Sequence, residues 1–407
     1  MLEEFKKCIQ RVFYFLKILD LVPAFNDNQR TMFKRFCNHP IFLLHLLTIN
    51  VQFFAEVLWL VDALKTRQRF LEITMSFPFC AVKLLSNFKT ISTVVYSHCI
   101  NDLIERLDKL QLVLIPCRTE RDIFVTQLTG KYFSQLNSMS TKVVYLIFIT
   151  IIFFGISPLA VMLSGYYKTG EIELLLPLSA SYPFNVYGIR YFFIYIYQVW
   201  TAVQAAFFLF GPDYLFFTFF TFIYVQFVIL QYDVQRVVNE DQNADNVLFK
   251  SNIKNLVCRH VELIKCVELL EEISSKSILF NAFTSSITIC ISGFSILVLD
   301  DIVRMASFLF ILKFCLIQIL FYCYCGDNIM SSSKQVNDAL YNSLWYNLDV
   351  SGKRSCLIVM IRAQQPCKLT AMGFFDVNLI AFANILSNTW SYFTLLKTMI
   401  DPNLIKS

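Results

Sequence analysis

The chain has 407 residues, of which 56% are hydrophobic and only 16% are charged, with a mean hydropathy of +0.56. Soluble domains are about a quarter charged, so this composition excludes a soluble globular protein and indicates several membrane-spanning helices. The net charge of +5 is explained by loops near anionic lipid, and nothing in its distribution indicates nucleic acid as a partner.

The first 38 residues are basic and carry apolar residues at helical spacing. This pattern predicts a short packed or interfacial helix. The segment lacks the apolar core and cleavage site of a signal peptide. We therefore expect residues 1–38 to form a cytoplasmic N-terminal segment.

Seven apolar runs follow, each long enough to cross a bilayer. They lie at 40–62, 70–92, 143–164, 190–232, 277–299, 305–325 and 374–396. The fourth run is twice bilayer length and is interrupted only by Gly211-Pro212-Asp213. Read as one helix, it leaves 24 Lys and Arg on one side of the membrane and 8 on the other. Because positive residues collect in the cytoplasm, we predict an all-α protein with seven transmembrane helices, a cytoplasmic N-terminus and an extracellular C-terminus.

Helical spacing continues on the side predicted to be cytoplasmic. Residues 100–114 and 246–275 combine apolar i, i+3/i+4 spacing with acid–base pairs. A third helical region is expected over 331–347 and 354–366. We expect these segments to extend spans two, four, five and six into a compact cytoplasmic bundle.

Of the charged residues inside the predicted spans, four carry most weight. They are Glu56, Lys83, Asp213 and Lys313. Each is costly at the centre of a bilayer, so these residues are expected to face the bundle interior and to pair. We expect Asp213 to pair with Lys83 or Lys313, and Glu56, near the outer end of its span, to snorkel towards water.

No enzymatic site is indicated. The four histidines lack zinc-ligand spacing, Cys323 and Cys325 lack two further ligands, and no glycine-rich phosphate loop is present. The pair Asp300-Asp301 lies in a short outer turn and is not expected to be catalytic. We predict no enzyme activity, no cofactor and no metal.

Small polar residues form one stripe on the last span. At spacings of three and four they are Asn384, Ser387, Asn388, Ser391, Thr394 and Thr398. Such a stripe either hydrogen-bonds to neighbouring helices or lines a wet path. Its length and its continuation into Lys397 favour water. One helix cannot enclose a pore, so a pore here requires an oligomer.

Six motifs, in order along the chain, resemble those of the insect odorant receptors. They are "LPLSASYPFN", "GPDYLFFTFF", "CRHVELIKCVELLEEISS", "LFYCYCGDNI", "ALYNSLWYN" followed by "IRAQQPCKLTA", and "SYFTLLKT". In the first motif Asn185 replaces the usual aspartate. The resemblance runs through most of the chain.

The resemblance implies an odorant-gated, non-selective cation channel in the plasma membrane of a sensory neuron. Its partners would be the olfactory coreceptor, a small volatile ligand, monovalent and divalent cations, and the lipid bilayer. The chain lacks the coreceptor's long insertion between spans four and five, which indicates an odorant-tuning subunit. The resemblance also implies that four subunits, joined through the cytoplasmic anchor and the last helix, surround one pore. The coreceptor has an apolar residue around Lys397. Four lysines in a homomeric pore would repel cations, so a homomeric pore is not expected.

The resemblance also places the sites. Ligand is expected in the outer half, between spans two, three, four and six, against Phe77, Cys80, Ile152, Gly155, Leu159, Tyr195, Gln198 and Phe308. The pore is expected to be lined by Asn384, Asn388, Ser391, Tyr392, Leu395, Lys397 and Thr398. The implied organisation is helices one to six with the pocket (39–335), a cytoplasmic anchor (336–373), a pore-lining half-helix (374–399) and an extracellular tail (400–407).

Three alternatives remain open. A gustatory-receptor-like homomeric channel is disfavoured because the chain lacks the Thr-Tyr…Gln-Phe ending. A G-protein-coupled receptor would have an outer N-terminus, and neither an Asp-Arg-Tyr motif after span three nor an Asn-Pro-x-x-Tyr motif in span seven is present. A secondary transporter would need broken helices in both halves, and Gly211-Pro212 has no counterpart.

Overall fold

A computed structural model describes residues 2–18, 40–65, 70–112, 119–171, 174–240, 246–299 and 302–399. The described part is helical apart from its connections and one isolated bridge between Thr370 and Asp376. This confirms the all-α prediction. The expectations for residues 19–38, for Asp300-Asp301 and for the tail 400–407 lie outside the described residues.

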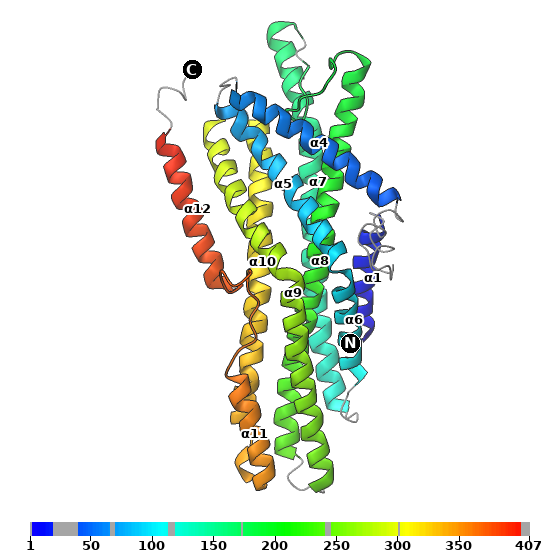
Figure 1. Cartoon of the computed structure of the whole chain (residues 1–407), viewed down its shortest axis with the longest axis vertical. Coiled ribbons are helices and arrows are strands. Elements are labelled where there is room, and N and C mark those ends of the chain that lie inside the picture. Colours follow the sequence, from blue (N-terminus) through cyan, green and yellow to red (C-terminus); the bar gives the residue numbers. More distant parts are fainter. Residues whose placement is uncertain are drawn as a thin grey trace.

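The helices form one elongated bundle, with α4 slanting across its upper end and α12 standing to one side (Figure 1). Their bounds are α1 (Leu2–Ile18), α4 (Pro40–Lys65), α5 (Phe70–Val95), α6 (Ser97–Leu112), α7 (Thr119–Thr169), α8 (Ile189–Glu240), α9 (Asn246–Val298), α10 (Ile302–Tyr341), η2 (Trp345–Asn347), α11 (Val350–Ala363) and α12 (Leu379–Met399). The seven predicted spans correspond to α4, α5, α7, α8, α9, α10 and α12.

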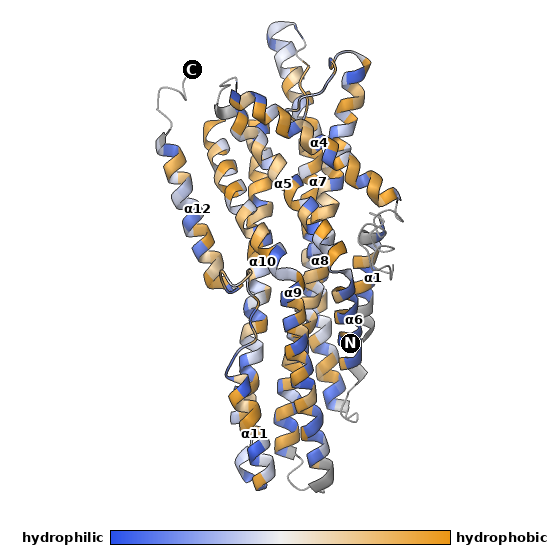
Figure 2. Cartoon of the chain, in the orientation of Figure 1, coloured by the Kyte–Doolittle hydropathy of each residue, from blue (hydrophilic) through white to orange (hydrophobic). Residues whose placement is uncertain are grey.

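Hydropathy divides the bundle along its long axis. The upper half is predominantly apolar and the lower half alternates apolar and polar residues (Figure 2). Within the described residues, five helices are long and apolar enough to cross a membrane by composition alone: α4, α7, α8, α9 and α10. Both α5 and α12 are less apolar because polar side chains interrupt them, and they belong to the same bundle.

The fourth apolar run is a single helix, as predicted, because α8 continues without a break through Pro212. A proline inside a helix removes the hydrogen bond to the carbonyl four residues earlier, here that of Phe208. The Thr90 hydroxyl of α5 donates to this carbonyl at 3.2 Å. The neighbouring helix therefore supplies the partner that the proline removes.

Two buried ion pairs join helices inside the apolar half, and their partners differ from the prediction. Asp213 pairs with Lys89, not with Lys83 or Lys313, at 2.6 Å. Lys83 pairs with Glu56, which is only 1% exposed and does not snorkel, while Lys313 lies on an exposed face. Lys89 lies six positions after Lys83, which is about 9 Å along a helix, and this places the two lysines level with different acids.

The Asp213 carboxylate is also held by α10. The Tyr322 hydroxyl donates to Asp213 Oδ1 at 2.6 Å, and the Gln318 amide donates to Asp213 Oδ2. Lys89 has no exposed surface, and its ammonium lies 5.3 Å from the centre of the Tyr322 ring. This cluster joins α5, α8 and α10 near the middle of the bundle.

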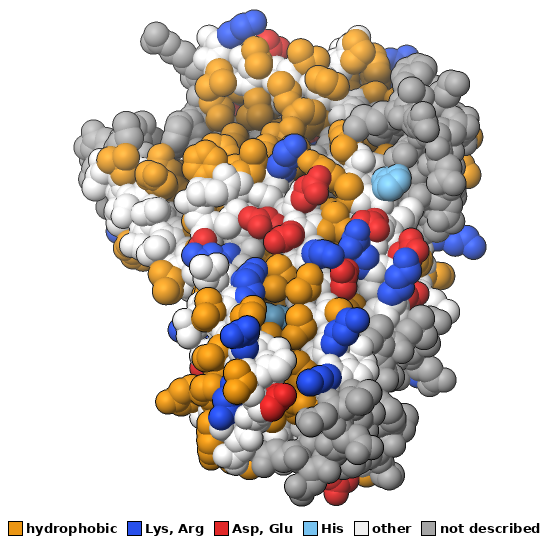
Figure 3. Space-filling view, turned by 60° about the horizontal axis from the view of Figure 1, so that its bottom comes forward, with side chains coloured by type: hydrophobic (Ala, Val, Ile, Leu, Met, Phe, Trp, Pro, Cys, Tyr) orange, Lys and Arg blue, Asp and Glu red, His pale blue; other side chains and the backbone are white. Residues whose placement is uncertain are grey.

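The lower half, which we call the extension bundle, consists of α6, α11 and the parts of α7, α8, α9 and α10 below the apolar runs. Lys and Arg gather on its surface among Asp and Glu (Figure 3). One part of the extension bundle was not predicted: the third span, α7, begins at Thr119 and so also extends below the apolar run. The second span does not continue unbroken, since α6 follows α5 after a turn at Tyr96.

A buried charge cluster holds the extension bundle together. Arg121 of α7 makes a two-bond contact with Asp233 of α8, at 2.6 and 2.7 Å. Arg259 of α9 donates to the same carboxylate at 2.6 Å and to Gln226 at 2.8 Å. All four side chains are at most 3% exposed. Paired arginine forks of this kind fix the relative positions of helices.

His260 predicts how the extension bundle responds to acid. It lies buried against Phe227, and burial together with the nearby Arg362 lowers its pKa from 6.5 to about 4. The unfolded chain therefore binds the proton more tightly than the folded chain. The contribution of neutral His260 to stability is complete above about pH 6.5 and is lost as the pH falls towards 4. At pH 5 this residue should lower the free energy of unfolding of the purified protein by about 2 kcal/mol relative to pH 7.

Thermal unfolding between pH 7 and pH 4.5 measures this effect. His260→Leu keeps the apolar contact and removes the titrating group, so its melting temperature should fall less with pH than that of the natural protein. Equal falls in the two proteins would contradict the assignment.

The connection between α11 and α12 turns back against α10. A short hairpin is closed by hydrogen bonds from Val377 N to Leu369 O and from Ala371 N to Phe375 O, at 2.8 and 3.0 Å. Gly373, with φ of +76°, lies at its tip. A Cβ on Gly326 of α10 would lie 2.1 Å from the Val377 carbonyl oxygen. The close approach of these two backbones thus requires a glycine.

Candidate ligand-binding site

An apolar hollow lies in the upper half of the bundle. We call it the inner chamber; its empty volume, including the space at its mouth, is about 820 Å³. Its lining comes from α5, α7, α8, α10 and the α7–α8 connection. The lining residues are Phe79, Val82, Lys83, Ile147, Thr150, Ile151, Phe154, Leu178, Ala202, Ala205, Ala206, Leu209, Ser307, Ile311 and Phe314.

Helical spacing explains why these residues meet. On each helix the lining residues recur three and four positions apart, for example Ala202, Ala205, Ala206 and Leu209 on α8. Residues at this spacing share one face of a helix. The α8 face carries three alanines, so the helices pack while space remains between them. Such an apolar chamber with few polar groups is typical of a small-molecule site.

A second hollow of about 1040 Å³, the outer vestibule, lies above the inner chamber. It is more polar, and its lining includes Glu72 of α5 and Arg304 of α10. Four residues line both spaces: Phe79, Phe154, Leu178 and Ser307. The vestibule and the chamber therefore adjoin at these shared residues.

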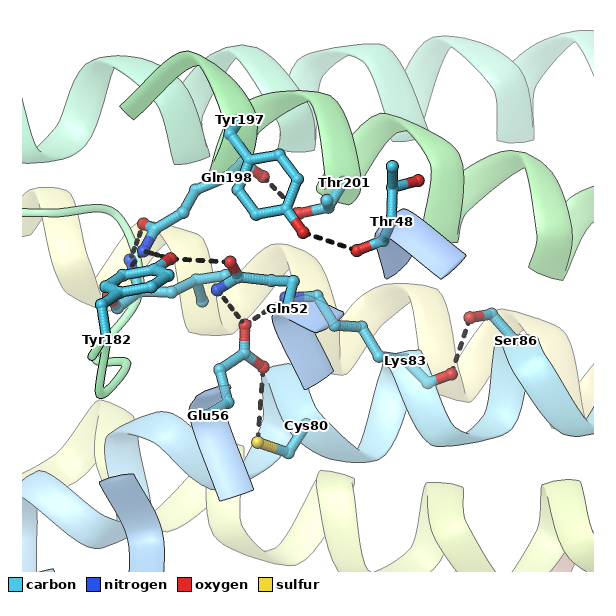
Figure 4. A network of polar contacts seen from close by, with 11 residues as sticks. Thr48, Gln52, Glu56, Cys80, Lys83, Ser86, Tyr182, Tyr197, Gln198 and Thr201 are labelled. Carbon is cyan, nitrogen blue, oxygen red and sulfur yellow. Dashed lines mark hydrogen bonds and ion pairs between the residues drawn. The ribbon is translucent and has the colours of Figure 1, made fainter. Parts of the chain in front are cut away.

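A polar network holds the wall of the chamber in place (Figure 4). Glu56 of α4 accepts from Gln52 at 2.8 Å, from Lys83, and from the Cys80 thiol at 3.4 Å. The Tyr182 hydroxyl donates to Gln52 at 2.7 Å. The network therefore joins α4 and α5 to the α7–α8 connection.

Gln198 of α8 fixes Leu178, which lines both the vestibule and the chamber. Its amide accepts from Leu178 N at 2.9 Å and donates to Leu178 O at 3.2 Å, and it has no exposed surface. The Ser181 amide donates to Ala55 O of α4 at 2.9 Å. The connection above the chamber is thus held by directed hydrogen bonds to two helices.

Comparison with known proteins assigns the chain. The family profile described as 7tm Odorant receptor matches residues 69–390. The chain belongs to this family of insect odorant receptors. It is 23% identical to putative odorant receptor 85d of Drosophila melanogaster over 92% of this chain and 90% of that protein. It is 30% identical to odorant receptor 47a of the same species over 60% of this chain and 64% of that protein.

The fold agrees with the assignment. The insect olfactory receptor OR5 from Machilis hrabei superposes with a TM-score of 0.80 at 17% identity, over 96% of this chain and 97% of that chain. The structure of the same protein in complex with eugenol superposes with a TM-score of 0.81 at 16% identity, over 98% of this chain and 100% of that chain. The odorant receptor is therefore a seven-helix membrane bundle and belongs to a class of ligand-sensing proteins, not enzymes.

The receptor distributes the eight expected ligand-binding residues over several environments. Phe308 lines the outer vestibule. Cys80 and Gln198 belong to the polar network. The Tyr195 hydroxyl donates to the Gly155 carbonyl and joins α8 to α7. Phe77 is half-buried, whereas Ile152 and Leu159 are exposed on α7. The chamber-lining residues Phe79, Ile151 and Phe154 lie one or two positions from expected residues.

The seven expected pore residues share one property in the receptor. Asn384, Asn388, Ser391, Tyr392, Leu395, Lys397 and Thr398 are all exposed on α12. The opposite face packs against the bundle, and Phe393 lies against Gly293 of α9, where an added Cβ would meet its ring at 3.6 Å. The hydroxyls of Ser391 and Thr398 donate to carbonyls of their own helix, at 3.1 and 2.8 Å.

Proposed function

We propose that this receptor is the odorant-tuning subunit of a heteromeric, odorant-gated, non-selective cation channel in the plasma membrane. Its partner is the olfactory coreceptor, its N-terminus is cytoplasmic, and its ligand is a small volatile molecule. The observation that carries the proposal is the apolar inner chamber, placed below a vestibule in an odorant receptor fold. The similar receptor that forms a complex with eugenol supports a small aromatic or aliphatic ligand.

The chamber can supply the energy that gating needs. Burying about 200 Å² of apolar odorant contributes about 5 kcal/mol before entropic costs. Only the part of this energy that differs between closed and open states moves the gate, and about 2.7 kcal/mol shifts such an equilibrium a hundredfold. Lys83, Thr150 and Ser307 are the polar groups of the described lining, so orientation would depend on few hydrogen bonds and tuning would be broad.

The exposed face of α12 supports a shared cation path. Its hydroxyls use their hydrogens within the helix, which leaves oxygen lone pairs to meet water or cations. Lys397 is exposed on the same helix. Four copies of this lysine around one axis would repel cations, which favours a pore shared with a different subunit.

Whole-cell recording tests the proposal. Cells would express this receptor, the coreceptor, or both, and a broad panel of volatiles would be applied. The expected result is an odorant-evoked cation current that needs both chains. A response from this chain alone that disappears when G-protein signalling is inhibited would overturn the channel mechanism.

Filling the inner chamber should reduce the sensitivity of the receptor to odorant. Ala206 lines the chamber, and Ala206→Phe adds a ring to the space that an odorant would occupy. We expect the half-maximal odorant concentration to rise more than tenfold, with surface expression unchanged. The matched control is Ile156→Phe on the exposed face of α7, which should leave the dose–response curve in place; equal shifts in both variants would argue against the chamber as the site.

A further inference from the structure

Two more cavities lie below the inner chamber, between α7, α8 and α10. The first, which we call the polar cavity, has a volume of about 840 Å³ and is lined by Tyr132, Gln135, Leu136, Ser138, Met139, Lys142, Phe220, Thr221, Tyr224, Phe321, Tyr324, Cys325 and Asn328. The second, the apolar cavity, has about 460 Å³ and is lined mainly by apolar side chains such as Val143, Phe210, Phe217, Phe314 and Ile317. Leu136, Met139 and Phe321 line both, so the two cavities adjoin.

The lining residues of α7, α8 and α10 agree on the order of the two cavities along the long axis of the bundle. On α8 and α10, which run downwards, residues 210–217 and 314–321 line the apolar cavity and residues 220–224 and 321–328 line the polar one. On α7, which runs upwards, the polar cavity begins at Tyr132 and the apolar cavity reaches Val143, where the predicted span starts. The polar cavity therefore lies at the lower membrane boundary, with the apolar cavity above it.

The charge of the polar cavity has one sign. Lys142 is the charged residue among the described lining side chains, and no Asp or Glu lines the cavity. In the described part of the chain Lys142 has no carboxylate partner. Lys131 lies close by, with its ammonium 5.6 Å from the Tyr132 ring. The hydroxyls of Tyr132 and Tyr224 meet at 2.9 Å on the same wall.

The cavities are accessible from the side of the bundle. Gln135, Ser138, Met139 and Lys142 form the exposed face of α7 at this level, and Tyr324 of α10 is 45% exposed. An occupant can thus reach the site from the surrounding bilayer.

From this arrangement we infer that the two cavities bind one anionic phospholipid of the cytoplasmic leaflet. Its headgroup occupies the polar cavity beside Lys142, and an acyl chain enters the apolar cavity. A single cation without a neighbouring acid selects an anionic over a zwitterionic headgroup, and the apolar space above it accounts for the tail. The leaflet assignment rests on the orientation proposed above.

Photocrosslinking of the full-length receptor tests this inference. The purified receptor would be placed in phosphatidylcholine nanodiscs containing a photoreactive phosphatidylserine, and labelled peptides would be identified by mass spectrometry. We expect labelling around Met139 and Phe321. Lys142→Gln should reduce it about fivefold, the effect of one cation at a membrane surface, and Met139→Trp should reduce it by blocking the passage between the cavities.

The matched control is Lys168→Gln, which removes an exposed lysine at the opposite end of α7 and should leave labelling unchanged. Equal labelling by photoreactive phosphatidylcholine, insensitivity to Lys142→Gln, or displacement by soluble glycerophosphate would each overturn the lipid site. Nanodiscs contain the lipid in both leaflets, so the result does not depend on topology. Tyr187→Thr, which creates an Asn-x-Thr glycosylation sequence at Asn185, tests the orientation separately.

Discussion

Replacing Asp213 with alanine is expected to reduce the yield of folded receptor more than tenfold. The substitution leaves the Lys89 ammonium fully buried without its carboxylate, and it removes the acceptor of Tyr322 and Gln318. Removing one partner of a buried ion pair costs about 3–5 kcal/mol, a large fraction of the stability of a typical fold. Fluorescence-detected size-exclusion chromatography of tagged receptor measures the yield.

A double substitution separates the ion pair from general damage at this position. Lys89→Met combined with Asp213→Leu removes both charges and keeps apolar volume, so the yield should recover to near that of the natural protein. Lys313→Met changes an exposed lysine of α10 and should have little effect. A double variant no better than Asp213→Ala would show that the pair itself is not responsible.

Gly326→Ala is expected to uncouple α12 from the rest of the receptor. Helix propensity alone predicts a stabilisation of about 1 kcal/mol. Packing opposes this, because the new Cβ would lie 2.1 Å from the Val377 carbonyl oxygen, and a backbone carbonyl cannot rotate away as a side-chain tip can. Overpacking of a core costs about 1–3 kcal/mol, so the hairpin before α12 should shift away from α10.

Two readouts distinguish this effect from misfolding. Odorant binding in the inner chamber should persist, because that site lies far above Gly326 on α10, whereas the odorant-evoked current should be lost. Gly130→Ala in α7 is the control, since no atom lies within 4 Å of its added Cβ; it should keep full current. A Gly326→Ala channel with normal current would contradict the proposed role of this contact.

The sequence predicts where the helices lie along the chain better than it predicts which face of each helix lines the inner chamber. The four helices that the family resemblance assigns to the pocket also line the inner chamber. The rotation of each helix is set by its neighbours, and one position turns a side chain by about 100°. Ile151 therefore lines the chamber while Ile152 is 54% exposed, and hydropathy cannot separate two adjacent isoleucines.

The sequence also does not determine which charged residues pair between distant helices. The cost of intramembrane charge predicts that Asp213 has a partner, but choosing Lys89 over Lys83 requires the relative height of α5 and α8. That height follows from side-chain packing across the interface. The polar stripe of α12 was easier to predict, because its residues lie on one helix and their spacing alone places them together.

The three alanines that line the proposed odorant site on α8 lie apart from the compact core that the same helix forms further along. Ala202, Ala205 and Ala206 border empty space, while the large aromatic residues further along the same helix, such as Phe216 and Phe219, form the compact core. Replacing one alanine with serine or valine would reshape the cavity by one or two atoms without disturbing that core. With the inner chamber as the proposed odorant site, single substitutions at these alanines would change odorant preference and still leave a stable protein.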